Sequence, residues 1–108
     1  MHFPYRLRRQ HLFPIIPVTL SHQKRIFRTE GLLDSGANFS LFSAGIAEYL
    51  DISLETGKPI DLVGIGGRIR GYRHIVDLAI ESVSFKAVIV FSAEFTSAFN
   101  LLDRKSVV

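Results

Sequence analysis

The 108-residue sequence contains no cysteine, which excludes disulfide bonds and metal sites built on thiolates. It has no uninterrupted apolar run close to the roughly 20 residues that a membrane-spanning helix needs. The arginines of residues 1–12 are not followed by the apolar segment of a secretory signal. We therefore expect a cytoplasmic protein with no membrane partner.

Strong charge and metal-ligand patterns are also missing. The formal net charge of +3 leaves an acidic partner possible without requiring one. The basic N-terminal segment, residues 1–12, favours a solvated arm over a nucleic-acid site. The histidines lack the spacing of metal ligands, so we expect neither a metal site nor a cofactor; they are His2, His11, His22 and His74.

The sequence does contain enough apolar residues for one compact domain. Hydrophobic residues make up 47% of the chain, and 108 residues are too few for two independent cores. Apolar patterns typical of strands or extended segments occur at residues 13–20, 25–33, 60–63, 68–80 and 85–91. The first two predict a hairpin, and apolar side chains on both faces of the last predict a strand buried on two sides.

Local signals refine this pattern. Pro14 and Pro17 argue against full pairing of the first strand on both sides. After Ser43, a plausible N-cap, apolar residues at helical spacing predict a short helix that ends near Asp51. Regular strands, one helix and no long-period repeat indicate an all-β fold of closed or sandwich type.

The stretch GLLDSGAN, from Gly31 to Asn38, is the strongest candidate for a functional site. A buried strand that turns sharply at its end, with Gly36 permitting the turn, would carry the Asp34 carboxylate into a cleft. Two carboxylates a few Å apart share a proton, so one is acid and the other base toward a water. The chain has no second Asp-Ser-Gly or Asp-Thr-Gly, so the second carboxylate would come from another copy. The alternative is an aspartate that only bonds its own turn.

A glycine cluster provides a second candidate. Gly64-Ile65-Gly66-Gly67 predicts the mobile tip of a β-hairpin, which could close over an extended chain and exclude water. An ordinary glycine-rich turn is the alternative. A phosphate-binding loop is disfavoured, because Ile69 stands where the third glycine of G-x-G-x-x-G belongs. A serine hydrolase is unsupported, because the G-x-S-x-G elbow is absent.

Together these motifs resemble the retropepsin-type aspartic proteases, the single-domain enzymes of retroviruses with cellular and bacterial relatives. The resemblance rests on residues 32–37, 63–67 and 100–104, and it spans about residues 14–104. It implies that residues 13–108 form a retropepsin-like closed β-barrel with one short helix, half of a symmetric homodimer. It further implies an aspartic endopeptidase that acts on polypeptides without a cofactor, with nucleic acid an unlikely partner.

The resemblance also implies roles for individual residues. Asp34 would be the catalytic aspartate, Ser35 would interlock with its mate across the dimer axis, and Gly36 and Ala37 would complete the active-site loop. Arg104 would brace the base of the active site. The flap over the substrate would consist of Val63, Gly64, Ile65, Gly66 and Gly67.

Two features differ from the family. Asp103 stands where the family usually has glycine, and an acid near the catalytic pair would raise carboxylate pKa values. The given sequence ends at Val108, before the further strand that helps build the dimer sheet in retroviral members. Three explanations stay open: other contacts hold the dimer, the sequence is truncated, or the dimer is weak. Both features favour an alternative, a retropepsin-like dimerisation or peptide-binding module without catalysis. A weaker alternative is RNA binding through the basic segment and the arginines after the glycine cluster.

Overall fold

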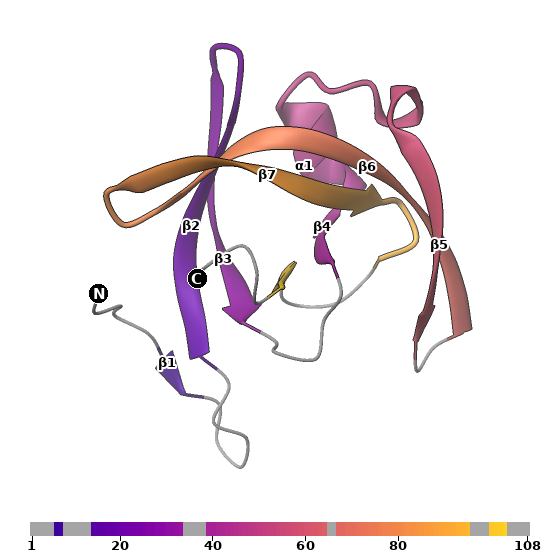
Figure 1. The fold of residues 1–108 in the computed structure, drawn as a ribbon, viewed down its shortest axis with the longest axis horizontal. Helices are drawn as coiled ribbons and strands as arrows, with labels where there is room; N and C mark the ends of the chain where they lie inside the picture. Colours follow the sequence, from indigo (N-terminus) through magenta and orange to yellow (C-terminus); the bar gives the residue numbers. More distant parts are fainter. Residues whose placement is uncertain (1–5, 8–13, 34–38, 65–66, 96–99, 104–108) are drawn as a thin grey trace.

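The computed structural model describes residues 6–7, 14–33, 39–64, 67–95 and 100–103. In this part of the chain it contains eight strands, one short helix and a 3₁₀ turn (Figure 1). In chain order they are β1 (Arg6–Leu7), β2 (Pro14–His22), β3 (Arg25–Leu33), β4 (Ser40–Ser43), α1 (Ala44–Tyr49), η1 (Leu54–Thr56), β5 (Lys58–Gly64), β6 (Gly67–Ile80), β7 (Val83–Ser92) and β8 (Asn100–Leu102).

The strands form one sheet that closes on itself. Their order is β1-β2-β3-β8-β4-β7-β6-β5, and an additional pairing of β2 with β6 closes six of them into a barrel. Closure is possible because β6, with 14 residues, pairs with β5 along its first half and with β2 near its end. Figure 1 shows β6 and β7 arching over the molecule between the β2–β3 hairpin and β5. The predicted all-β fold, a closed retropepsin-like barrel with one short helix, is confirmed.

The core is a cluster of buried apolar side chains inside this barrel and beneath α1. In β6 the predicted face of Val76, Leu78 and Ile80 is buried, each at 3% exposure or less. The full cluster is Ile16, Val18, Leu20, Phe42, Ile46, Ala47, Leu50, Ile52, Val76, Leu78, Ile80, Ala87, Ile89, Phe91 and Leu102. Alternation along each strand therefore selects which residues point inward.

Several predicted element boundaries agree with the structure. The strand at 25–33 has the predicted bounds and forms the predicted hairpin with β2. The helix follows Ser43 as predicted, although the Ser43 side chain makes no capping hydrogen bond. Pro17 lies between the two segments of β2 that have a second neighbour, β1 at residues 14–15 and β6 at 19–21. A proline is tolerated there because its missing N–H interrupts no ladder on that side.

Other expectations need correction. The strand β4 was not predicted, since four residues carry too little periodicity to indicate one. Strand β7 is buried on two sides only in part, because Val90 is fully buried whereas Val88 is 50% exposed. The basic N-terminal segment contains β1, whose Arg6 and Leu7 pair with β2. The division into residues 1–12 and 13–108 stays a prediction.

No helix in the described ranges is long and apolar enough to span a bilayer.

A substitution at Gly31 tests how closely β8 packs on β3. A β-carbon at Gly31 would lie 2.7 Å from Leu102 Cγ, so Gly31→Ala should destabilise the fold by about 1–3 kcal/mol. Gly45→Ala is the matched control: its β-carbon would meet only Ser43 Oγ at 3.9 Å, and alanine favours the exposed helix. Urea unfolding at one protein concentration measures both. Equal effects of the two substitutions would contradict this packing.

Candidate active site

Several predicted site residues lie outside the described part of the chain, and their roles stay predictions: Asp34, Ser35, Gly36, Ala37, Ile65, Gly66 and Arg104. The structure describes the strands that flank them. Residues 34–39 connect β3 to β4, and residues 65–66 connect β5 to β6. Figure 1 shows β3 and β5 ending toward the same side of the molecule. The two candidate motifs therefore begin from the same side of the barrel.

Strand β8 lies between the two strands that the Asp-Ser-Gly segment connects. It runs parallel to β3, with Leu102 opposite Leu33, and antiparallel to β4, with Leu101 opposite Leu41. Because β3 and β8 are parallel and in register at their last residues, both strands end at the same end of the sheet. Asp34 is the residue that follows β3 in the sequence, and Asp103 is the residue that follows β8.

Asp103 is bound to Ser40 by two hydrogen bonds. The Ser40 hydroxyl donates to Asp103 Oδ1 at 2.9 Å, and the backbone N–H of Asp103 donates to Ser40 Oγ at 3.1 Å. Ser40 is fully buried at the start of β4. Asp103, interpreted from the sequence as a charge near the catalytic pair, thus connects the end of β8 to β4. Sequence reasoning missed Ser40, whose only local signal is a small polar residue within an apolar run.

Asn100 attaches the other end of β8 to β3. Its side-chain Nδ2 donates to the backbone carbonyl of Glu30 at 3.0 Å and to Thr29 Oγ1 at 3.3 Å. Side-chain hydrogen bonds thus hold the three-residue strand at both ends. The strands on either side of the Asp-Ser-Gly segment are therefore fixed relative to each other.

An apolar row crosses the sheet on the face opposite the core. Its members are successive register partners in β2, β3, β8, β4 and β7: Ile15, Leu32, Leu101, Leu41 and Val90. Partners in a ladder share a face, and the neighbouring Leu33 and Leu102 pack in or against the core, so the row faces the other way. Leu32 and Leu101 are half-buried, which leaves apolar surface beside the end of β3.

The predicted glycine hairpin is present in the structure. Strands β5 and β6 are paired from Lys58–Arg73 to Gly64–Gly67. Gly67 has φ +108°, a conformation that side chains rarely adopt. Val63, next to the tip, is 78% exposed and so leaves an apolar side chain in solvent. The role of this hairpin as a flap stays a prediction.

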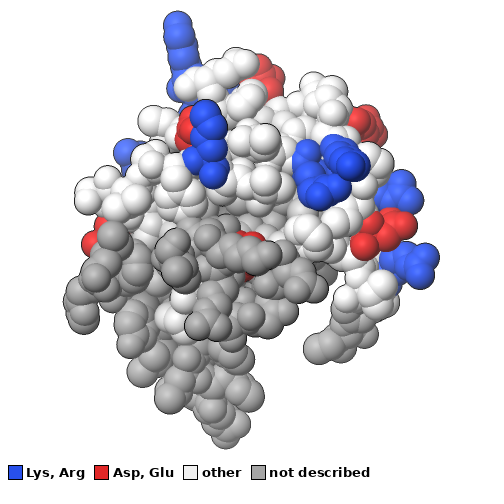
Figure 2. All heavy atoms as spheres, in the orientation of Figure 1, with Lys and Arg blue, Asp and Glu red and all other residues white. Residues whose placement is uncertain are grey.

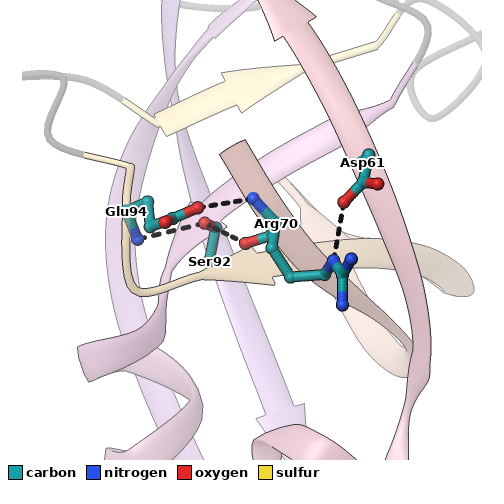
Figure 3. Close-up of polar contacts among 4 residues, drawn as sticks. All are labelled: Asp61, Arg70, Ser92 and Glu94. Carbon is teal, nitrogen blue, oxygen red and sulfur yellow. Dashed lines mark hydrogen bonds and ion pairs between the residues drawn. The ribbon is translucent and has the colours of Figure 1, made fainter. Parts of the chain in front are cut away.

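Charged groups lie on both strands of this hairpin. Figure 2 shows lysine and arginine side chains gathered on its side of the molecule, with acidic groups among them. Arg70 Nε contacts Asp61 Oδ1 at 2.6 Å across the two strands (Figure 3). The hydrogen bond from Arg70 lowers the pKa of Asp61, so the carboxylate stays ionised into acidic solution. The ion pair is present above the ordinary pKa of Asp61 and is lost as the pH falls through the lowered value.

A comparison with solved structures places this fold among known ones. The chain is similar to the EIAV protease complexed with the inhibitor HBY-793, with a TM-score of 0.67 and 16% sequence identity. The match covers 93% of this chain and 89% of that chain. No family model and no curated protein matches the sequence. The likeness establishes a retropepsin-like fold.

Removal of the Ser40 hydroxyl tests how β8 is held. Ser40→Ala deletes both hydrogen bonds to Asp103, and at about 0.5–1.5 kcal/mol each we expect a loss of about 1–3 kcal/mol of stability. Ser43→Ala, at the other end of β4, is the control, because that side chain caps no helix N–H. Chemical unfolding compares the two variants. A loss from Ser43→Ala as large as that from Ser40→Ala would exclude a special role for this contact.

Proposed function

We propose that this chain is an aspartic endopeptidase that is active as a homodimer, with one Asp34 from each copy in the catalytic pair. The observation that carries the proposal is the retropepsin-like fold, in which the segment bearing Asp34 connects β3 and β4 around β8. One Asp-Ser-Gly per chain supplies half of a carboxylate pair. A second copy of the chain is therefore the partner that the proposal requires.

The proposed chemistry needs only the two carboxyl groups and a water. The pair shares one proton, and the ionised member takes a proton from the water as it attacks the scissile carbonyl. The protonated member donates to the oxygen that becomes negative. Collapse of the tetrahedral intermediate then breaks the C–N bond. The leaving nitrogen takes up the proton that the first carboxylate took from the water, and the second carboxylate takes back the proton from the hydroxyl oxygen, so the pair again shares one proton. Because the pair titrates as one unit, we expect optimum activity on the acid side of neutral.

The proposed substrate is a polypeptide bound in an extended conformation. Its backbone would bond in the manner of an added strand beneath the two β5–β6 hairpins. The half-buried members of the apolar row, Leu32 and Leu101, lie beside the end of β3 and would contact apolar side chains near the scissile bond. Arg104 is proposed to brace the base of the site.

A second candidate is a retropepsin-like module that binds or dimerises without catalysis. The observation that favours it is Asp103, an acid at the end of β8, where β8 is in register with the end of β3. A well-folded dimer that binds peptide and leaves it intact at every pH would support this candidate.

Asp34→Asn tests the proposed catalysis. The variant keeps the size of the side chain but cannot share the proton, so peptide cleavage should fall by roughly 10⁴-fold or more. Asp51→Asn is the control: Asp51 is exposed at φ 61°, a backbone conformation that asparagine also adopts, and activity should be unchanged. Mixing Asp34→Asn with the wild type should also reduce activity through hybrid dimers. Equal turnover by Asp34→Asn and the wild type would refute the mechanism.

Leu101→Ala tests the proposed role of the apolar row. Loss of the half-buried side chain should lower kcat/KM by about 10- to 200-fold for peptides with an apolar residue at the affected position. A larger apolar side chain on the peptide should restore part of the loss. Val83→Ala is the control, because Val83 lies in β7 at the turn from β6, outside the row. Parallel losses for all peptides, whatever their side chains, would argue against a pocket.

A further inference from the structure

We infer that Glu94 is a positioning residue, which holds the β5–β6 hairpin at a defined place over the site. This inference rests on the proposed function, since it gives the position of the hairpin a role in holding substrate. It concerns the point where β6 extends beyond β7. The register of these two strands begins at Tyr72–Phe91, so the part of β6 nearer the tip has no partner strand in β7.

Two side chains take the place of the missing strand at Arg70. The backbone N–H of Arg70 donates to Glu94 Oε1 at 2.5 Å, and the Ser92 hydroxyl donates to the Arg70 carbonyl at 2.6 Å (Figure 3). Both main-chain groups of Arg70 are therefore bound, one to the last residue of β7 and the other to the turn that follows it. A carboxylate is a stronger acceptor for such an N–H than a neutral oxygen.

This anchor is connected to the barrel core. Ser92 is the last residue of β7 and is fully buried. Its hydroxyl also accepts the backbone N–H of Glu94 at 3.1 Å, which fixes the turn that carries the carboxylate. Next to Arg70, a side chain at Gly71 would collide with Val90 Cγ1, so β6 and β7 pack closely just before they separate. Glu94 thus extends the contact between β6 and the end of β7 toward the tip.

Arg70 also makes the side-chain contact to β5, the other strand of the hairpin. The Arg70 guanidinium binds Asp61 of β5, while its backbone binds Glu94. The Asp61 carboxylate binds the exposed side chain of Arg70, whereas the Glu94 carboxylate binds the main chain of β6. Removal of the Glu94 carboxylate should therefore release β5 and β6 together, whereas removal of the Asp61 carboxylate should change mainly the position of β5. A released hairpin would bind substrate more weakly without changing the carboxylate pair.

Glu94→Ala and Glu94→Gln distinguish this role from a general effect on stability. Glu94 is exposed, so both variants should fold. Glu94→Ala should raise KM roughly 10-fold with kcat changed less than about 3-fold. One charge-assisted hydrogen bond that positions the hairpin is lost, whereas the carboxylate pair that carries out the reaction is unchanged. Glu94→Gln keeps an oxygen acceptor and should recover most of the loss. Glu48→Ala, in the exposed face of α1, is the control and should match the wild type.

Hydrogen exchange of the Arg70 amide provides a measurement independent of activity. In Glu94→Ala this amide should exchange at least about 10-fold faster, while the amides of Val76 and Leu78 in the barrel part of β6 should be unchanged. Unchanged exchange at Arg70 would overturn the inference, and so would faster exchange with an unaltered KM. If the wild type cleaves no peptide, the proposed function fails, and the exchange rates together with peptide affinity still decide whether Glu94 positions the hairpin.

Discussion

The structure depends on the insertion of one short strand, β8, between β3 and β4. Three residues provide few ladder hydrogen bonds, so side chains complete the attachment: Asn100 binds β3, and Asp103 binds Ser40 of β4. Gly31 allows the Leu102 side chain to lie directly over β3. Without β8, the facing edges of β3 and β4 would have unpaired backbone groups in the interior of the sheet. The Asp-Ser-Gly segment would then connect two strands with no fixed separation.

This arrangement separates two apolar surfaces that are adjacent in sequence. Leu33 and Leu102 pack in or against the core, while their neighbours Leu32 and Leu101 lie on the opposite face. A shift of one residue in the register would exchange the two sets, because side chains alternate along a strand. The contacts at both ends of β8 prevent such a shift. The same constraint that stabilises the core therefore also defines the apolar row beside the candidate site.

The β5–β6 hairpin has a different balance of contacts. Near the barrel it packs against β7, and toward the tip it is a two-stranded ribbon, which is marginally stable alone. Polar contacts from Ser92, Glu94 and Asp61 meet at Arg70, where the support of β7 ends. The described contacts thus attach the hairpin to the barrel at Arg70, just beyond the last pair between β6 and β7.

Local patterns in the sequence were sufficient for the strand at 25–33, the helix after Ser43, the glycine hairpin and the all-β class, because alternation and turn residues act within a few positions. They also marked Asp34 as a candidate and supported the resemblance to the retropepsin-type proteases. The tertiary structure alone decided that β2 meets β6, that β4 exists, and that Asp103 binds a hydroxyl 63 positions away. The partners in these contacts are far apart in the chain, so no local signal marks them. These contacts form only when the barrel closes, because polar groups that become buried then need hydrogen-bond partners.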